Sequence, residues 1–497
     1  VKDGVVWIEV ADRGGELGAT RAGVTGEAPS DVLWHYNLSA RHLDKLCERV
    51  DTFSVSGDGE RLVVRHRDDI IVVPSSHKVD DDDPACIRVD LTRLRRTVNP
   101  RAEWRQMFDE NGRLMASHYW REDMNGVDWD GVLNRYRPLV DLCHVVDDLH
   151  DILWETVAEL NTSHSYVSAS GAAGDSDMRA GLLGADVSSG ADGAKVVRVI
   201  PGESSDPRAW SPLRAAGVAV TEGDVIVAVD GRKVGADGNL GELLEGSAGR
   251  VVELTVHRGE NERQVAVVPM ADEAPLRYHD WVASRRRYVE EHSGGRLGYL
   301  HVPDMVSDGW AELHRQIGEA TRHEGVIADV RFNHGGHTSQ LVVERLARRV
   351  VGWDYSRWYA TADTYPQNAV RGPIVMVTNQ WAGSDGDIVA AATQAMGYAK
   401  VIGERSWGGV VGIDGRFDLV DGTSVTQPRY AGWYGSYGWG VENHGVDPDI
   451  VVTVSPEDWE ADRDVQLDAA IAECLRQLDD KPAATAPELP GPAFGRC

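Results

Sequence analysis

Apolar runs and helical patterns alternate between residues 296 and 454 of this 497-residue chain. Four apolar runs have the character of strands, and three helical patterns lie between them. The runs cover residues 297–302, 325–330, 373–378 and 399–402, and the helical patterns cover residues 309–322, 339–349 and 387–396. Such alternation is typical of parallel strands joined by crossover helices. We therefore predict an α/β domain at residues 280–475.

The chain before this domain changes character twice. Residues 1–90 contain short β runs between Gly and Asp turns, which suit propeller blades or a sandwich but are too few to close a propeller. Helical spacing then predicts a helical domain at residues 95–183, with one helix beginning near Pro100 and another at about residues 147–160. Residues 171–193, rich in Gly, Ala, Ser and Asp, are expected to form a linker or loop.

The next part of the chain carries the pattern of a PDZ domain. The pattern consists of a strand at residues 196–200, a short helix at 211–217, the run 222–231 and a closing strand at 251–256. We place this PDZ-like domain at residues 184–272. Such domains bind extended peptide ends by adding a strand to a sheet edge. A small β domain without a peptide ligand has the same pattern, so that alternative stays open.

Composition excludes several classes of function. The chain carries 79 Asp and Glu against 51 Lys and Arg, and a net charge of −28 opposes binding to nucleic acid or anionic lipid. No apolar run approaches the roughly 18 residues that span a bilayer. Five scattered cysteines without a CxxC pair argue against a disulfide scaffold and favour a reducing, cytoplasmic compartment. Because no His, Cys, Asp or Glu cluster has ligand spacing, we expect neither a metal nor a cofactor.

The two ends of the chain also allow predictions. The chain begins with Val1 and has no basic region followed by an apolar region, as a secretion signal would have. We interpret it as a fragment whose natural N-terminus lies upstream. The end of the chain is rich in Pro and Ala, and residues 476–497 are expected to be a disordered tail.

The most informative segment follows the third predicted strand and contains Ser384. Residues 382–388 read AGSDGDI, so a buried strand runs into a glycine-flanked turn whose serine lies at a helix N-terminus. Backbone N–H groups and the helix dipole stabilise negative charge that develops beside a nucleophile there. The same serine would serve as an ordinary N-cap, and the segment taken alone favours the cap.

Three further segments carry groups that a serine nucleophile needs. Gly335 and Gly336 follow the second strand and offer backbone N–H groups to an oxyanion, in acyl transfer or in enolate chemistry. His164 lies in a turn crowded with hydroxyls, among them Ser163, and is either a general base or a surface histidine. Glu442 lies in a tight turn before a strand and is otherwise a residue of a solvated loop.

Together these segments resemble the tricorn protease family, serine peptidases that trim peptides released by proteasomes and are related to the C-terminal processing peptidases. The resemblance covers about residues 1–473. It is strongest at residues 162–166, 382–388, 407–413 and 440–443, which occur in the family's order. It implies a serine peptidase that hydrolyses short peptides, such as proteasome products, through an acyl-enzyme on Ser384.

The resemblance implies a role for each matching residue. Ser384 is the nucleophile and His164 its general base. Ser163 and Glu442 form a relay that fixes the imidazole and stabilises its cation. Such a tetrad places a serine hydroxyl where the usual triad has a direct carboxylate–imidazole contact.

The oxyanion hole and the specificity residue are also implied by the resemblance. The backbone N–H groups of Gly336 and Asp385 form the hole. The family's turn has three consecutive glycines, and the first of them is His334 in this chain, which leaves the matching donor in place. Asp354 matches an aspartate that favours basic side chains before the cleaved bond.

Family members carry two N-terminal β-propellers, a helical domain, a PDZ-like domain and a crotonase/Clp-like α/β catalytic domain, and they assemble as hexamers. The resemblance therefore implies that residues 1–90 are the last blades of a propeller in an N-terminally truncated chain, and that the chain forms homo-oligomers. Two alternatives stay open. One is a catalytically silent peptide-binding scaffold built around the PDZ-like domain. The other is a crotonase-like CoA enzyme, which does not need Ser384, His164 and Glu442 to converge.

Overall fold

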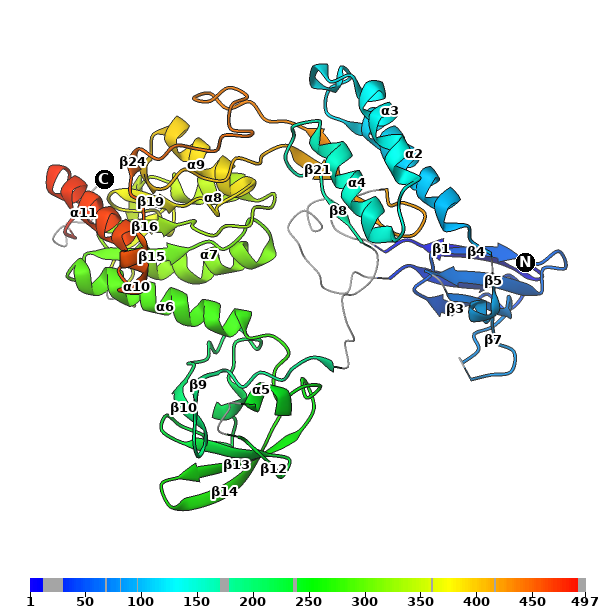
Figure 1. Cartoon of the computed structure of the whole chain (residues 1–497), viewed down its shortest axis with the longest axis horizontal. Coiled ribbons are helices and arrows are strands. Elements are labelled where there is room, and N and C mark those ends of the chain that lie inside the picture. The colour runs from blue at the N-terminus through cyan, green and yellow to red at the C-terminus, as the bar shows by residue number, and fades with distance from the viewer. Residues whose placement is uncertain are drawn as a thin grey trace, which may run out of the picture.

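The computed structural model describes residues 1–11, 30–67, 69–80, 82–95, 97–169, 178–235, 239–358, 361–414 and 417–489 (Figure 1). These residues form two small N-terminal sheets, a helical group, a β domain and an α/β domain, in that order along the chain. No helix among them is long and apolar enough to cross a membrane.

Two antiparallel sheets hold the N-terminal strands. One has the order β1-β2-β3, with bounds Gly4–Glu9, Val32–Asn37 and His42–Glu48. The other has the order β4-β5-β6-β7, with bounds Thr52–Val55, Arg61–His66, Asp69–Pro74 and Ile87–Arg88. Leu33 of the first sheet and Leu62 of the second are fully buried in one shared core. These short antiparallel strands agree with the β pattern predicted for residues 1–90.

Three helices form the helical group: α2 (Pro100–His118), α3 (Trp129–Val140) and α4 (Val146–Ala158). The start of α2 follows local rules, because the Asn99 side chain accepts a hydrogen bond from the Ala102 backbone and proline occupies the first helical position. The helices bury one core that includes Phe108 and Leu153. Helix α3 was not predicted, since Gly131 and Pro138 interrupt its helical pattern.

A segment of the α/β domain completes this helical core. Strand β22 (Ser424–Val425) pairs with β8 (Val167–Ser168), and Leu419 and Val425 are buried among the helical side chains. The same segment contains β21 (Gly412–Asp414), paired with β23 (Gln427–Tyr430). Figure 1 shows it as the orange chain that passes beside α4 and β8. The helical core is therefore not confined to the predicted residues 95–183.

The β domain is an antiparallel sheet with the order β14-β13-β11-β10-β9, and β12 pairs with β11. The bounds are β9 Ala185–Gly190, β10 Gly193–Val199, β11 Val225–Val229, β12 Arg232–Lys233, β13 Val252–Arg258 and β14 Asn261–Val267, with the short helix α5 at Leu240–Leu243. Strand β9 corrects part of the linker predicted at residues 171–193, because pairing with β10 orders a segment of weak β propensity. Residues 171–177 of that prediction lie outside the described residues. The helix predicted at residues 211–217 is a single 3-10 turn, Pro212–Arg214.

The α/β domain has a parallel sheet with the order β15-β16-β19-β20-β24. Its strands are β15 Leu297–His301, β16 Gly325–Asp329, β19 Ile374–Thr378, β20 Ala399–Gly403 and β24 Ile450–Val451, and its helices are α6 Ala274–His292, α7 Ser307–Ala320, α8 Ser339–Leu346, α9 Asp385–Met396, α10 Pro456–Glu460 and α11 Val465–Asp480. The four strands predicted from the apolar runs are all present, and β24 is a fifth.

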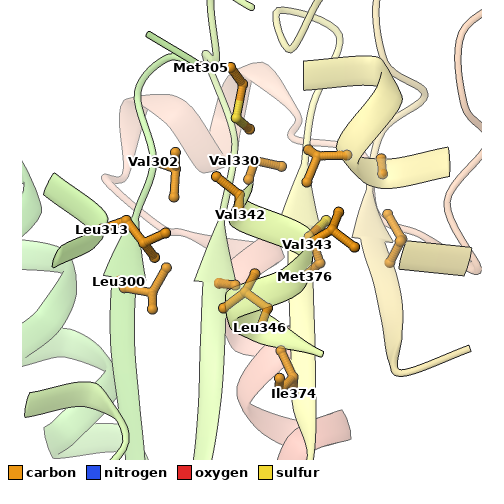
Figure 2. Close-up of a cluster of buried hydrophobic side chains, with 14 of the residues drawn as sticks. Leu300, Val302, Met305, Leu313, Val330, Val342, Val343, Leu346, Ile374 and Met376 are labelled. Carbon is orange, nitrogen blue, oxygen red and sulfur yellow. The ribbon is translucent and has the colours of Figure 1, made fainter. Parts of the chain in front are cut away.

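Alternate residues of the strands pack on opposite faces of this sheet. One core joins the sheet to α7, α8 and α9, and Figure 2 shows part of it, including Leu300, Val330 and Met376. The other core joins the sheet to α6 and α11, and includes Tyr299 and Val375. Burial on both faces explains why these strands are continuous apolar runs in the sequence.

The C-terminal prediction is wrong in part. Residues 476–480, placed in a disordered tail, form the last turn of α11, where Leu478 is buried against the sheet. Beyond the helix, the Ala484 backbone donates a hydrogen bond to the Arg371 carbonyl at 2.8 Å. Apolar side chains at helical spacing continue past the predicted boundary, which is why the helix does too. Residues 490–497 lie outside the described residues.

Candidate active site

Loops that leave the carboxyl ends of the parallel strands meet at one edge of the sheet, and Asn333 joins three of them. Its side-chain amide donates to the Val302 carbonyl at 2.8 Å, and its side-chain oxygen accepts from the Gly335 backbone at 2.9 Å. Its own carbonyl accepts from the Gly383 backbone at 3.0 Å. The carboxyl edge of an open α/β sheet is the usual place for a ligand site.

Ser384 lies in the turn between β19 and α9 in an unusual backbone conformation. Its φ is 57° and its ψ is −120°, and although it stands at the N-cap position, its side chain makes no capping hydrogen bond. A positive φ is uncommon outside glycine and persists where the surrounding structure imposes it, often at functional sites. The geometry therefore does not support the interpretation of Ser384 as an ordinary helix cap.

The glycine turn after β16 packs directly against this serine. A Cβ atom on Gly335 would lie 2.5 Å from the Ser384 Cβ and 3.0 Å from its Oγ, so only glycine fits. Gly336 has a φ of +144°, and a Cβ there would lie 2.1 Å from the Met305 carbonyl oxygen. His334 is not among the residues of positive φ, and its side chain is exposed. Histidine at that position therefore adds no backbone strain to the turn.

His164 follows α4, and its backbone is held by the segment that completes the helical core. The Thr426 hydroxyl donates to the His164 carbonyl, and the Thr426 backbone donates to the Tyr166 carbonyl at 3.0 Å. The Nδ1 atom of the His164 ring lies 2.8 Å from the Val411 carbonyl oxygen. A carbonyl only accepts, so Nδ1 carries the proton and Nε2 is the nitrogen that can act as a base.

Trp407 links the histidine to the serine. The Trp407 ring centroid lies 5.5 Å from that of His164, in an edge-on arrangement. A Cβ on Gly383, the residue before Ser384, would lie 2.8 Å from a ring carbon of the same tryptophan. One indole ring thus contacts both the imidazole and the backbone of the serine turn.

The pKa of His164 lies below its ordinary value. Burial lowers this pKa by more than the Val411 carbonyl and the Glu442 carboxylate raise it.

The half-buried Glu442 carboxylate accepts four hydrogen bonds. Its Oε1 accepts from the Ser163 backbone at 2.6 Å. Its Oε2 accepts from the Ser163 hydroxyl at 3.0 Å, the Val410 backbone at 2.8 Å and the Val411 backbone at 3.0 Å. The Ser163 hydroxyl oxygen lies 3.3 Å from the His164 Nδ1, farther than the Val411 carbonyl. Ser163 and Glu442 therefore lie together behind the imidazole, but its shortest Nδ1 contact is to a backbone carbonyl.

Asp385 is the first residue of α9, so its backbone N–H lies at the helix N-terminus beside Ser384. Its buried carboxylate accepts a hydrogen bond from the Ser339 backbone at 3.0 Å, which ties the start of α8 to the start of α9. Burial raises the pKa of this carboxyl group. The backbone groups of Gly336 and Asp385 thus come from the two turns that flank the serine.

Asp354 lies apart from these residues. It is exposed at the end of β17 (Gly352–Asp354), which pairs with β18 (Asp363–Tyr365). The neighbouring Trp353 lines a pocket with Gly318 and Arg322 at the C-terminal end of α7, which leads into the amino end of β16. A five-residue strand separates the two edges of the sheet by roughly 15 Å, at about 3.3 Å per residue. Within one chain Asp354 is therefore on the opposite edge from Ser384.

Sequence reasoning missed the Val411 carbonyl, the Val410 backbone and the position of Trp407. The segment at residues 407–413 was one of the strong matches, but no role was inferred for it. A backbone carbonyl has the same chemistry in every residue, so the sequence carried no signal for this contact.

Three family models match the chain. The Tricorn protease C1 domain matches residues 100–158, the Tricorn protease PDZ domain matches residues 181–272, and Peptidase family S41 matches residues 296–452. The matches occur in the order of the helical group, the β domain and the α/β domain. They support the multidomain architecture predicted from the sequence.

Individual relatives agree with these models. Tricorn protease homolog 1 of Streptomyces coelicolor is 56% identical over 98% of this chain and 46% of that protein. The tricorn protease of Thermoplasma acidophilum is 35% identical over 91% of this chain and 42% of that protein. A crystal structure of the tricorn protease matches with a TM-score of 0.85 at 33% identity, over 96% of this chain and 46% of the other. The chain spans less than half the length of each relative. By these matches it belongs to the tricorn protease family, as the sequence resemblance predicted.

Proposed function

We propose that this chain is a serine peptidase that hydrolyses short peptides, such as proteasome products, through an acyl-enzyme on Ser384. The observation that carries the proposal is the unusual backbone of Ser384, which packs against the Gly335 turn while its side chain does not cap the helix. The contact of Trp407 with both His164 and the serine turn supports it.

In the proposed mechanism the Ser384 Oγ attacks the scissile carbonyl while the His164 Nε2 accepts the hydroxyl proton. The Nδ1–H bond to the Val411 carbonyl keeps the imidazole in the required tautomer. Glu442, acting through Ser163, stabilises the imidazolium that forms. The imidazolium then protonates the leaving amine, and a water molecule that His164 deprotonates releases the acyl group.

The oxyanion of the tetrahedral intermediate is proposed to bind the backbone N–H groups of Gly336 and Asp385. Two turns supply these donors, so each has a fixed position before substrate arrives. Preorganised donors of this kind contribute about 2.7–4 kcal/mol of transition-state stabilisation each. The proposed reaction requires no metal or cofactor.

The wider assembly is proposed from the family. Residues 1–90 would be blades of a β-propeller, the α/β domain would be of the crotonase/Clp-like type, and the chain would act in the cytoplasm as a homo-oligomer, a hexamer. Selection of basic side chains by Asp354, predicted from the family resemblance, then requires the Asp354 of another copy, because within one chain this carboxylate is on the other edge of the sheet.

A fluorophosphonate probe tests the proposed nucleophile, together with hydrolysis of short fluorogenic peptides. Wild-type protein should be labelled and active, and Ser384→Ala should lose both properties. Ser455→Ala is the matched control, because Ser455 caps α10 by accepting a hydrogen bond from the Asp458 backbone. The control should keep labelling and activity. No labelling of the wild type would instead support a silent peptide-binding scaffold.

A further inference from the structure

Asp387 is a fully buried carboxylate three residues after Ser384 on α9. Three of its hydrogen-bond donors lie on one segment of chain, and the Ser384 backbone is a further donor. Its Oδ1 accepts from the Ser406 hydroxyl at 2.5 Å and from the Gly408 backbone at 2.8 Å, and its Oδ2 accepts from the Gly409 backbone at 3.3 Å. The carboxylate therefore fastens residues 406–409 to the first turn of the helix that carries Ser384.

The fastened segment leads directly to the groups that hold His164. It continues into Val410 and Val411, whose backbone N–H groups donate to Glu442, and the Val411 carbonyl accepts from His164. The Glu442 loop is tied to the same segment. The Asn443 backbone donates to the Gly408 carbonyl at 2.7 Å, and the Val446 backbone donates to the Ser406 hydroxyl oxygen at 2.9 Å. The carboxylate of Asp387 thus joins α9, the helix that follows Ser384, to the segment that fixes the imidazole.

Stability alone does not explain a carboxylate at this place. Burial raises the pKa of Asp387 to about 6, from a usual value of 3.8. Folding therefore favours the protonated form, and the contribution of this group to stability falls as pH rises from about 4 to 6. Among the described residues none forms an ion pair with Asp387, and the Tyr434 hydroxyl lies near both Asp387 and Asp385 of the same helix. A buried charge without a cation destabilises a fold.

We propose that Asp387, in its charged form, is a positioning residue that sets the place of His164 relative to Ser384 by holding residues 406–411 against α9. The proposal rests on the proposed peptidase function. On protonation, an O–H replaces one acceptor site, so the carboxyl group can no longer accept all three hydrogen bonds with equal strength. The segment that carries the Val411 carbonyl then loosens, and the imidazole loses its alignment.

The first test is Asp387→Asn, which keeps the size of the side chain and removes the charge. We expect kcat for peptide hydrolysis to fall roughly 10- to 100-fold, because a misplacement of about 1 Å costs on the order of 10²-fold. We expect KM to stay within about twofold and the urea midpoint not to fall at pH above 7. Asp308→Asn is the matched control, an exposed aspartate in the first turn of α7, and should leave all three quantities unchanged.

The pH profile separates positioning from a merely structural role. In wild type, protonation of His164 removes activity and protonation of Asp387 lowers it further, so the logarithm of kcat/KM should fall more steeply with decreasing pH than in Asp387→Asn over the range near pH 6 in which Asp387 titrates. Asp385 also has a raised pKa, but its carboxylate faces Ser339 and is present in both proteins, so it cancels in this comparison. An unchanged slope, or a kcat within twofold of wild type, would overturn the proposal.

A second test does not depend on catalysis. In protein with isotope-labelled histidine rings, the His164 resonance, assigned by its loss in His164→Ala, should show an inflection near pH 6 from Asp387 in addition to its own titration. That inflection should vanish in Asp387→Asn.

A second variant, Ser406→Ala, keeps the charge and should retain the inflection while kcat falls. This variant replaces Asp387→Asn in the activity test if Asp387→Asn does not fold. A single inflection in wild type would refute the coupling. Hydrolysis that persists in Ser384→Ala would refute only the proposed nucleophile.

Discussion

Replacing Glu442 by Gln tests the relay behind His164 while keeping the size of the side chain. In the structure Oε1 accepts one hydrogen bond and Oε2 accepts three. A glutamine amide has a single acceptor oxygen, which we expect at the Oε2 position because three donors converge there. Its NH₂ group then faces the Ser163 backbone N–H. One charge-assisted hydrogen bond, of about 1.5–3 kcal/mol, is therefore lost.

The expected effect on catalysis follows from the same contacts. In Ser-His-Asp triads the corresponding change costs about 10⁴-fold in kcat, because the imidazole takes the wrong tautomer. Here the Val411 carbonyl holds the Nδ1–H group independently of Glu442, so the tautomer is kept. The remaining effect of the substitution is weaker stabilisation of the imidazolium cation. At about 1.4 kcal/mol per decade, a loss of 1.5–3 kcal/mol corresponds to a kcat lower by roughly 10- to 100-fold.

Steady-state hydrolysis of a fluorogenic peptide from about pH 5 to 9 measures this loss and its pH dependence. The charge of Glu442 raises the pKa of His164, so the acid limb of kcat/KM should move to lower pH in Glu442→Gln. The exposed Glu457→Gln in α10 is the control and should behave as wild type. A loss of about 10³-fold or more would refute the role of the Val411 carbonyl in fixing the tautomer. An unchanged kcat would remove Glu442 from the site.

Three further predictions have distinct expected outcomes. Ser384→Ala and His164→Ala should each lower kcat by several orders of magnitude, and the double variant should be hardly worse, because the pair acts as one unit; additive losses in steady-state kinetics would contradict the pairing. Gly336→Ala should abolish hydrolysis, because the new Cβ would lie 2.1 Å from a carbonyl oxygen of the neighbouring loop. Asp464→Ala should destabilise the fold by about 3 kcal/mol in urea denaturation, because it removes a partner of the buried Arg331, 2.8 Å away. A midpoint equal to that of wild type would show that Asp329, which also pairs with Arg331 at 2.7 Å, is enough to compensate its charge.

The sequence alone determined the helices and strands whose positions are set by local sequence signals. The parallel strands β15, β16, β19 and β20 are apolar runs because cores cover both faces of the sheet, so each was predicted to within about two residues. The short strand β24, whose residues are exposed, was not predicted. Helix α2 begins where Asn99 and the following proline predict it. Where local signals were weak, prediction failed. Strand β9 is ordered by pairing with β10, and α3 packs into the helical core despite its Gly and Pro.

The residues of the candidate site could also be picked out from the sequence, because a serine, a histidine and a carboxylate are side chains with recognisable neighbours. Ser384, His164 and Glu442 were singled out from their segments, and Gly335 and Gly336 from their turn. Taken alone, the first three segments favoured a helix cap, a surface histidine and a solvated loop, and the family resemblance implied the catalytic roles. The structure brings the two turns together and places Glu442 behind His164. It leaves Asp354 at the opposite edge of the sheet, which the spacing of residues along the chain could not reveal.

Only the tertiary structure decided how these groups are held. The partner of the His164 Nδ1 is a backbone carbonyl 247 residues away, in a segment that leaves the α/β domain to complete the helical core. Asp387 reads in the sequence as an ordinary acidic residue in a first helical turn, and its burial depends on where residues 406–409 fold back. Backbone donors and acceptors are the same at every position, so their partners are set by the path of the chain and not by the identity of the residues.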